Sequence, residues 1–396
     1  MNSMQEQLSQ VLTPSIQEGP REVHITFIGG QLLPVYNAIV ATEPHIVECI
    51  YSEQTKKDIE TLRPEITQPI IESKPLSPTN PHKILKRAQE LAERYANDNI
   101  TLNITSGLKS WTHLFSLVFN PLQNARVVYM DQNNNLWDYK TMEGTNDFVF
   151  NMLAVFRLNK NTLTQYTKLT DFTEEDEESL RTIEEMRKYT RHFNSLFLAT
   201  TKQEQNALIP RKGSRPGDED SVVTWDKTGF KGGAGAKLSV TINIKGLPHE
   251  YELESPHAFQ LAFNAGWFEY KVALLFSRWE RAKEIILNCV FPVKSDSKKD
   301  KNEVDIIVNA GSKLIFVECK TQIERTTDID KFRSVVKNYG GMGSKSVFVT
   351  DAVKSVAARE KCEEHGIIDI ALLAEDFSEE AFFKTLNREI HQINTK

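Results

Sequence analysis

Residues 23–130 alternate short apolar runs with stretches of helical spacing, and this alternation limits the fold more than any other feature of the chain. Apolar runs that fit buried strands occur at residues 23–28, 45–51, 100–105 and 126–130. Stretches with helical spacing lie at residues 33–42, 53–63, 81–97 and 108–119. Strands that alternate with helices form parallel sheets through right-handed crossovers. We therefore expect an α/β, Rossmann-like domain over residues 21–165, preceded by a disordered extension over residues 1–20.

The middle of the chain, residues 166–245, carries weaker signals, and we interpret it as a helical and loop linker region. An acidic run at 171–185 follows Thr173, a residue type that caps helices, so we expect a solvated helix over about 173–193. The stretch 209–237 is rich in glycine, proline and charge, which predicts a loop or a partly disordered hairpin.

Residues 209–245 also carry seven Lys or Arg against four acids, with Trp225 and Phe230 among them. Such a segment could grip single-stranded nucleic acid through charge and stacking, or it could be a surface loop. Both interpretations stay open at this point.

Residues 246–396 are expected to form a second α/β domain. A strand at 237–245 precedes a long helix predicted from Pro256 to about Cys289, with Ser255 as its cap. Two strands, a helix over 328–339, a strand over 346–350 and a closing helical region follow.

The two strands predicted at 303–308 and 313–321 form a hairpin around the turn at 309–312. A turn centred between Ala310 and Gly311 pairs Val304 with Val317. One face is then wholly apolar, and it consists of Val304, Ile306, Val308, Ile315, Val317 and Cys319. The opposite face holds Asp305, Glu318 and Lys320, with the two acids within reach of one shared cation.

These residue types suit hydrolysis of a phosphodiester. Asp305, Glu318 and the backbone carbonyl of Cys319 can hold Mg²⁺ or Mn²⁺, which leaves positions for water and a phosphate oxygen. Lys320 can orient the water or stabilise charge on the phosphate. Acid–lysine pairs also decorate many half-exposed strands, where they contribute roughly 0–1 kcal/mol, so the pattern alone does not decide between the two interpretations.

The segment Glu303-Val-Asp305…Val317-Glu318-Cys319-Lys320 resembles the D…ExK core of the PD-(D/E)xK nuclease superfamily, with Val304 where the motif has its proline. The preceding segment, residues 264–269, resembles the glutamate-bearing first helix of that restriction-endonuclease-like fold, which makes Glu269 a fourth candidate catalytic residue. Glu269 could also be a helix-surface acid paired with Lys271 or Arg278. The resemblance implies a metal-dependent nuclease acting on DNA or RNA.

Ligands of open parallel sheets bind beyond the carboxyl ends of the strands, at helix N-termini. Gly29, Gly30 and Gln31 follow the first predicted strand, and residues 105–110 follow the strand at 100–105. Small residues with free N–H groups and a nearby lysine suit a phosphate, although each loop alone is also ordinary punctuation between a strand and a helix. A GxGxxG pattern is absent after the first strand, which argues against NAD.

The series Gly29-Gly30-Gln31, Ser52-Glu-Gln-Thr55 and Thr105-Ser106-Gly107-Leu108-Lys109 resembles a CARF domain, the CRISPR-associated Rossmann fold, whose usual loop is close to TGGTK. The resemblance implies a homodimer that binds a cyclic oligoadenylate at its two-fold axis. It also implies that the pocket is lined by Gly29, Gly30, Gln31, Ser52, Thr105, Ser106, Gly107 and Lys109. A CARF domain followed by a PD-(D/E)xK domain is the layout of type III CRISPR ancillary nucleases activated by cyclic tetra-adenylate.

Composition excludes other classes. No apolar run is long enough to span a bilayer, and residues 1–20 lack the features of a signal peptide, so we expect no membrane partner. Four widely spaced cysteines argue against a zinc site and a disulfide framework, which favours a cytoplasmic protein. Two alternatives remain: a non-catalytic ligand sensor that binds nucleic acid, and a DNA-repair nuclease without second-messenger control.

Overall fold

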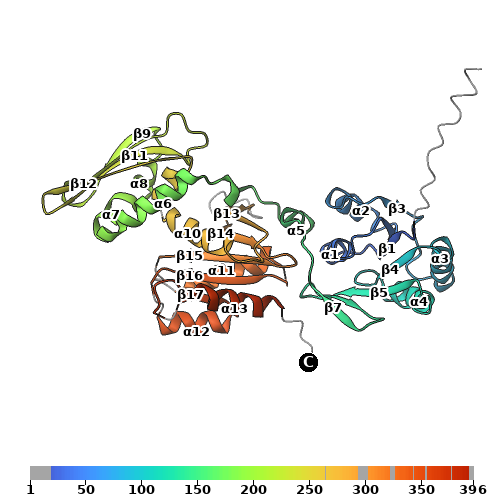
Figure 1. Ribbon diagram of the computed structural model, residues 1–396. Helices are drawn as coiled ribbons and strands as arrows, with labels where there is room; N and C mark the ends of the chain where they lie inside the picture. Colours follow the sequence, from blue (N-terminus) through green and yellow to red (C-terminus); the bar gives the residue numbers. More distant parts are fainter. Residues whose placement is uncertain are drawn as a thin grey trace, which may run out of the picture. The chain divides into compact units, whose positions relative to one another are not determined.

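The computed structural model describes residues 19–263, 265–292, 302–321, 326–341, 343–352, 355–375 and 377–391. The chain divides into two compact units, Met1–Phe148 and Val149–Lys396, which are described separately (Figure 1). The extension expected over residues 1–20 lies outside the described residues, apart from Gly19 and Pro20. The boundary also differs from the expected one at residue 165, because residues 149–165 belong to the second unit.

The first unit is built on one seven-stranded sheet with the order β3-β2-β1-β4-β5-β6-β7. The first five strands are parallel: β1 (Glu22–Phe27), β2 (Ile46–Ile50), β3 (Ile70–Glu72), β4 (Asn99–Asn103) and β5 (Ala125–Met130). Two short antiparallel strands, β6 (Leu136–Asp138) and β7 (Glu143–Thr145), extend one edge. The helices are α1 (Leu33–Thr42), α2 (Lys56–Leu62), α3 (Pro81–Arg94) and α4 (Lys109–Phe119).

This order places the loops that follow β1 and β4 side by side. Within the sheet, β2 and β3 lie to one side of β1, and β4 and β5 lie to the other side. The crevice between β1 and β4 is therefore the switch point, where open parallel sheets bind ligands. Below it, Phe27, Trp111 and Phe115 form a fully buried aromatic core that fixes α4 against β1. The predicted Rossmann-like domain is confirmed.

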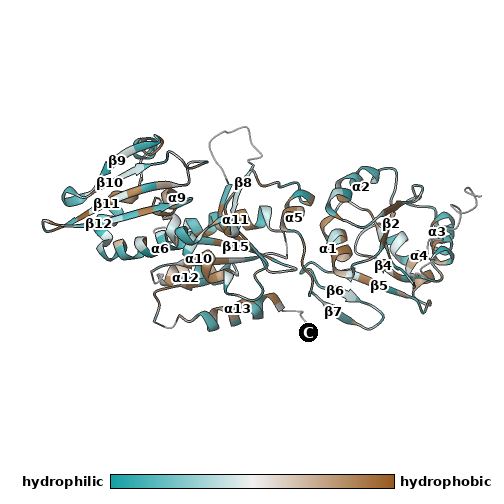
Figure 2. Cartoon of the chain, turned by 45° about the horizontal axis from the view of Figure 1, so that its top comes forward, coloured by the Kyte–Doolittle hydropathy of each residue, from teal (hydrophilic) through white to brown (hydrophobic). Residues whose placement is uncertain are grey.

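The second unit contains a six-stranded mixed sheet with the order β17-β16-β15-β14-β13-β8. Its strands are β8 (Gln165–Lys168), β13 (Glu284–Phe291), β14 (Asn302–Asn309), β15 (Leu314–Lys320), β16 (Lys345–Thr350) and β17 (Ile368–Ala371). Its helices include α5 (Met152–Leu158), α10 (Gly266–Ser277), α11 (Thr327–Tyr339), α12 (Val356–Glu364) and α13 (Glu379–His391). Figure 2 shows hydrophobic colour on the strands and on α10, whereas the solvent faces of the outer helices are hydrophilic.

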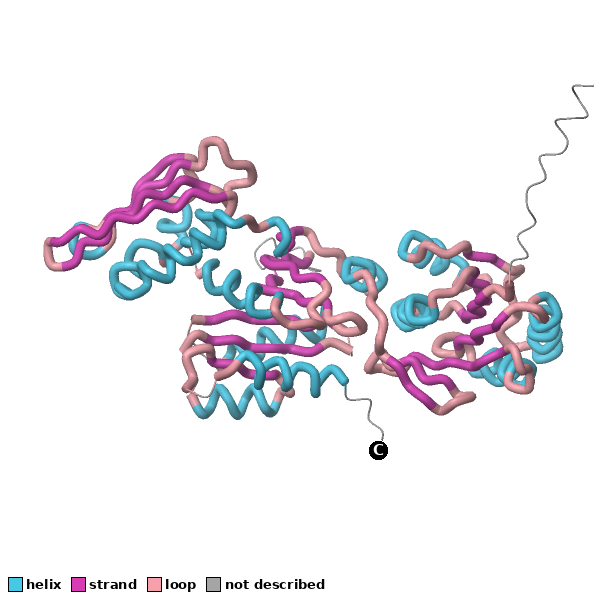
Figure 3. The backbone as a smooth tube through the Cα atoms, viewed as in Figure 1, coloured by secondary structure: helices cyan, strands magenta, loops and turns pink. Residues whose placement is uncertain are grey.

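Residues 166–245, which we expected to be a helical and loop linker, form together with residues 246–255 a structured part of the second unit. A four-stranded antiparallel sheet has the order β12-β11-β10-β9 and is separate from the six-stranded sheet (Figure 3). Its strands are β9 (Lys212–Pro216), β10 (Val222–Asp226), β11 (Ala236–Ile244) and β12 (Leu247–Ser255), and three helices accompany it, α6 (Glu174–Met186), α7 (Thr190–Phe197) and α8 (Lys202–Ala207). Alternating residues such as Val223, Trp225 and Leu238 are buried, and they join the same core as α10.

The long helix expected from Pro256 to Cys289 is wrong. The chain instead forms α9 (Ala258–Ala262), then α10, then the strand β13. Ala265 has a left-handed φ of 64°, which interrupts the helix, and the Gly266 Cα approaches the Gln260 carbonyl too closely for any side chain. The apolar run after residue 284 is a buried strand, which periodicity alone does not distinguish from a buried helix.

The acidic run is only partly solvated. Thr173 donates its backbone N–H to Asp176 Oδ2 (2.9 Å), as expected at a capped helix start. Asp176 is nevertheless fully buried, and it accepts hydrogen bonds from the backbone N–H of His257 (2.9 Å) and from its imidazole (2.8 Å). This acid therefore ties α6 to the segment before α9.

Candidate functional site

The hairpin of β14 and β15 pairs antiparallel from Ile306–Val317 to Asn309–Leu314. The turn runs from Ala310 to Lys313, whose carbonyl accepts the Ala310 N–H at 2.9 Å. It is centred one residue later than predicted, so the register is shifted by two residues and Val304 does not pair with Val317. A shift of two leaves every side chain on its predicted face, since strand faces alternate with a period of two.

Both faces of the hairpin carry the residues that alternation predicts. The apolar face is completely buried in the core that contains α10, and it consists of Val304, Ile306, Val308, Ile315, Val317 and Cys319. On the other face the side chains of Asp305 and Glu318 keep 14% and 15% of their exposure, and Lys320 keeps 38%. The structure thus brings Asp305, Glu318 and Lys320 together at one edge of the core.

The three groups are linked directly. Lys320 Nζ lies 2.7 Å from Glu318 Oε1 and 3.8 Å from Asp305 Oδ2. Across the hairpin the backbone N–H of Cys319 donates to Asp305 Oδ2 at 2.7 Å, which fixes the carboxylate between the two strands. The hairpin therefore holds an ammonium group between two carboxylates that are almost completely withdrawn from water.

Glu269 approaches the same cluster from the first turn of α10. Burial raises its pKa well above the ordinary range of a glutamate, and the neighbouring Asp305 carboxylate adds to the increase. The two acids also line one cavity together. The alternative of a surface acid paired with Lys271 or Arg278 is not what the structure shows. The Lys271 ammonium contacts Glu184 at 2.7 Å, and the Arg278 guanidinium contacts Glu379 at 3.0 Å.

The cluster contains three acids, Glu269, Asp305 and Glu318, but only one cation, Lys320. Burial raises the pKa of Asp305, and burial together with Asp305 raises the pKa of Glu318 to about 7. For Lys320, burial acts to lower the pKa, but the Asp305 and Glu318 carboxylates outweigh it and the net pKa is raised. The two carboxylates therefore favour the protonated, cationic form of Lys320.

Within the described part of the chain, no group of three or more His, Cys, Asp or Glu side chains is arranged to hold a metal ion. The donor set nevertheless fits a hard divalent cation, because Asp305 and Glu318 supply carboxylate oxygens next to the Cys319 backbone. The raised pKa of each acid has the same cause, desolvation without enough positive charge, which a bound cation would remove.

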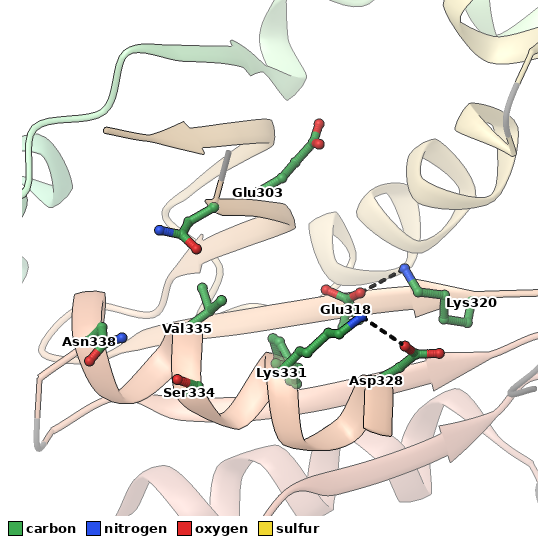
Figure 4. A pocket seen from close by; sticks show the side chains of 10 residues that line it. Glu303, Glu318, Lys320, Asp328, Lys331, Ser334, Val335 and Asn338 are labelled. Carbon is green, nitrogen blue, oxygen red and sulfur yellow. Dashed lines mark ion pairs between the residues drawn. The ribbon is translucent and has the colours of Figure 1, made fainter. Parts of the chain in front are cut away.

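Two cavities flank the cluster. One, of about 450 Å³, lies between the hairpin and α11, where Glu318 and Lys320 face Asp328 and Lys331 (Figure 4). The other, of about 580 Å³, is lined by Glu269, Asp305, Glu303 and Asn288, with apolar walls from α9 and the end of α8. Glu303 lines both cavities.

Sequence reasoning assigned no role to Asn288, Asp328 or Lys331. Asp328 adjoins the cluster closely enough to contribute to the raised pKa of Glu318. In the sequence, the predicted helix that carries Asp328 and Lys331 begins shortly after Lys320. This proximity alone does not predict that these two side chains face the cluster.

The basic segment 209–245 does not offer Trp225 for stacking on a nucleic acid. Trp225 is buried, and Gly213 packs against its indole ring. Most of its cations have internal partners: Lys212 pairs with Asp226, Arg215 with Glu204, Lys237 with Glu254, and the Lys227 ammonium donates to the Leu208 carbonyl. Four of the seven cations of this segment therefore have a partner within the protein, although the Lys212 and Lys237 side chains stay largely exposed.

In the first unit, a cavity of about 430 Å³ lies at the switch point of the sheet. Its lining includes seven of the eight residues that the CARF resemblance implies: Gly29, Gly30, Gln31, Ser52, Thr105, Ser106 and Gly107. Lys109 is not part of the lining; it is the exposed first residue of α4. Pro78, Leu108 and Trp111 add an apolar wall that the loop motifs did not reveal.

The cavity depends on close contact between its two glycine-bearing loops. A Cβ at Gly29 would lie 2.5 Å from Ser106 Oγ and 3.2 Å from the Gly107 N. Gly107 has a φ of +92°, and a Cβ there would collide with Phe27. The Thr105 hydroxyl accepts the Met130 N–H at 2.7 Å, so it anchors the loop to β5.

No helix among the described residues has both the length and the apolar character needed to cross a membrane. The four cysteines, Cys49, Cys289, Cys319 and Cys362, are free and buried.

No protein-family model matches the chain, and no curated protein matches it in sequence. Several solved structures match its fold. Can2 from Sulfobacillus thermosulfidooxidans, in complex with cyclic tetra-adenylate, has a TM-score of 0.53 and 17% identity, over 93% of this chain and 99% of that one. Protein VC1899 from Vibrio cholerae has a TM-score of 0.62 and 14% identity, over 93% and 97% of the two chains.

A type III CRISPR defence DNA nuclease activated by cyclic oligoadenylate has a TM-score of 0.53 and 16% identity. The match covers 94% of this chain but 52% of that one, so the present chain spans about half its length. These likenesses extend over both units. The chain therefore has the fold of these proteins, an α/β architecture in which a Rossmann-like domain is followed by a second α/β domain.

Proposed function

We propose that this protein is a metal-dependent nuclease that a cyclic oligoadenylate, in the first instance cyclic tetra-adenylate, switches on. The observation that carries the proposal is the convergence of Asp305, Glu318 and Lys320 on one face of a buried hairpin, with Lys320 Nζ 2.7 and 3.8 Å from the two carboxylates. Can2 was solved with cyclic tetra-adenylate, and a second protein of this fold is a DNA nuclease activated by cyclic oligoadenylate.

The residues divide the work as follows. Asp305, Glu318 and the Cys319 carbonyl would hold Mn²⁺ or Mg²⁺, and Glu269 would complete the set or hold a second ion. A bound divalent cation supplies the positive charge that neutralises charge developing on phosphorus. Lys320, which stays protonated, binds a phosphate oxygen or orients the attacking water. The substrate is DNA, single-stranded RNA or both.

The ligand binds in the switch-point cavity of the first unit. Backbone N–H groups of Gly29, Gly30 and Gly107 suit phosphates, and the apolar wall that includes Trp111 suits adenine rings. We place Lys109, one residue beyond the lining residue Leu108, at the rim, where its flexible side chain can reach a phosphate. In a homodimer two such cavities face a two-fold axis, which suits a ring with an even number of units.

Control by the ligand requires that it bind the active arrangement more tightly than the inactive one. Cleavage therefore has to increase with ligand concentration at constant metal concentration. The test is a cleavage panel of single-stranded RNA, single-stranded DNA and supercoiled plasmid, with and without cyclic tetra-adenylate and cyclic hexa-adenylate, in Mg²⁺ and in Mn²⁺. A non-catalytic sensor would bind the ring and cleave nothing.

A DNA-repair nuclease without second-messenger control would cleave equally with and without the ring, and calorimetry would detect no binding of it. The variant Lys109→Ala tests the placement of the ligand. It should weaken ring binding and leave metal binding unchanged, whereas unaltered affinity for the ring would contradict a role for this lysine.

A further inference from the structure

Strand β13 is irregular at one residue, Asn288. Leu287 pairs with Ile306 and Cys289 pairs with Val304, but no pair forms at Asn288, which is level with Asp305. On the other side, the register against β8 shifts between Leu287 and Val290. Asn288 itself has a φ of 53°, in the left-handed region. A bulge of this kind redirects a side chain, and bulges are frequent next to active sites.

The redirected side chain belongs to the cavity of the candidate site. Asn288 lines the cavity of about 580 Å³ together with Glu269 and Asp305. Its amide nitrogen is shielded from solvent and has no hydrogen-bond partner among the described residues. A shielded donor without a partner and a left-handed backbone both cost stability. Because Asn288 carries both costs at a position level with Asp305, we infer that its side-chain amide binds a ligand.

The chemistry of the cavity narrows the choice of ligand. Its polar wall next to Asn288 is acidic, with Glu269, Glu303 and Asp305. A phosphate oxygen entering this wall needs neutral or positive donors. The Lys227 ammonium is engaged by the Leu208 carbonyl and lies over the Phe259 ring, so it does not supply one freely. The carboxamide of Asn288 can turn about its terminal torsion, which has broad minima, and present its N–H₂ to the cavity.

We propose that Asn288 is a fifth residue of the nuclease site, whose carboxamide donates a hydrogen bond to a non-bridging oxygen of the scissile phosphodiester. Asn288 would reach that phosphate from the cavity of about 580 Å³, and Lys320 from the neighbouring cavity of about 450 Å³, so the two donors lie on different sides of Asp305. No covalent change involves the amide, because it binds and orients. This inference rests on the proposed nuclease function.

The left-handed backbone offers a clean test, because Asn288→Gly removes the amide while glycine adopts this φ without strain. Asn288→Asp keeps the shape and replaces the donor with another acid. Lys160→Gly is the matched control, since Lys160 also has a left-handed φ, of 58°, and is exposed outside the site. The full-length variants are compared for melting temperature, for ring binding and for kcat and KM on the nucleic acid that the wild type cleaves.

We expect Asn288→Gly to melt at or above the wild-type temperature, because it removes the unpaired donor and the left-handed strain, and to keep the ring affinity. Its kcat should nevertheless fall about 100-fold, the usual effect of removing one donor from a charged transition state. The kcat of Asn288→Asp should fall further, and the kcat of Lys160→Gly should equal that of the wild type. In a Glu318→Gln background, which we expect to be inactive, Asn288→Gly should weaken oligonucleotide binding about tenfold, one hydrogen bond's contribution.

Full activity of Asn288→Gly would overturn the inference and leave the nuclease function intact. Equal loss of activity and of melting temperature in Asn288→Gly would also overturn it, because the residue would then be purely structural. A wild type that cleaves none of the substrates would contradict the proposed function and the role of Asn288 together.

Discussion

The ammonium group of Lys320 lies 2.7 Å from Oε1 of Glu318, two residues earlier on the same face of β15. It also lies 3.8 Å from Asp305 Oδ2 on β14. One cation therefore serves two carboxylates that burial has largely removed from water. This arrangement makes the cluster sensitive to the loss of its cation, to pH and to added metal.

Replacing Lys320 with methionine leaves two partly buried carboxylates without their cation. Lys320→Met should lower the free energy of unfolding at pH 8 by roughly 1–3 kcal/mol, because a charged group that loses its hydrogen-bond partner keeps its desolvation cost. Cleavage should be lost. Added Mn²⁺ should restore part of the stability, as measured by urea unfolding with and without the ion. A variant as stable as the wild type without metal would contradict this electrostatic account.

The raised pKa of Glu318 predicts how the stability of the metal-free protein changes with pH. The folded state holds the Glu318 proton up to about pH 7, against an ordinary value of 4.5. The stability that this proton contributes is complete below pH 4.5 and is lost as the pH rises through 7. Between pH 5 and 8 the wild type should therefore lose about 2–3 kcal/mol more than Glu318→Gln, which cannot ionise. Parallel pH profiles of the two proteins would show that Glu318 titrates normally.

Two adjacent glycines in the ligand cavity provide a matched pair of substitutions. A Cβ at Gly29 would lie 2.5 Å from Ser106 Oγ, whereas a Cβ at Gly30 meets nothing within 4 Å. Gly29→Ala should therefore force the two loops apart and weaken binding of cyclic tetra-adenylate at least tenfold by calorimetry. Gly30→Ala should bind within about threefold of the wild type, unless the ring itself occupies that space. The opposite order of affinities would contradict the described loop contact.

Arg187, in the short helix Arg187–Tyr189, links the structured region 166–255 to the strand end that carries Lys320. Its guanidinium contacts Asp351 Oδ2 at 2.6 Å and lies 3.6 Å over the Trp267 ring, while the Asp351 N–H donates to the Lys320 carbonyl at 3.3 Å. Arg187→Ala should destabilise the protein by about 2 kcal/mol, since it leaves the buried Asp351 unpaired.

The control for this substitution is Arg191→Ala, because Arg191 makes an ion pair with Asp218 that is far more exposed. Arg191→Ala should lower the free energy of unfolding by less than about 1 kcal/mol, as is usual for surface ion pairs. Equal unfolding free energies for the two variants, measured by chemical denaturation, would show that the Asp351 contact contributes nothing special.

The sequence predicts the architecture correctly where the spacing of apolar residues matches the residues that the structure buries. The predicted helix at 33–42 matches α1 residue for residue, and the Asp305–Lys320 face follows from alternation alone. The predicted faces of the hairpin were correct although the predicted register was wrong by two residues, because a shift of two keeps each side chain on its face. The loops after β1 and β4 could likewise be placed together, since parallel strands end at one edge of a sheet.

The parts that the sequence did not reveal depend on long-range packing. Of the sheet β9–β12, only β11 was predicted, as the strand at 237–245, because its apolar and polar residues alternate. Strand β9 is charged and contains glycine and proline, so it resembles a loop, and the burial of Trp225 in β10 depends on packing that the sequence does not show. The segment 256–289 reads as one apolar helix because nothing local marks the left-handed Ala265. Asn288 carries no motif at all, and its importance lies in a backbone angle and in its position opposite Asp305.

The most direct test of the account is cleavage by the purified full-length chain in Mn²⁺, measured with and without cyclic tetra-adenylate, beside Glu318→Gln. We predict cleavage by the wild type that rises strongly with the ring, and no cleavage by Glu318→Gln, although the variant binds the ring with wild-type affinity. Undiminished cleavage by Glu318→Gln would contradict the assignment of the hairpin as the active site.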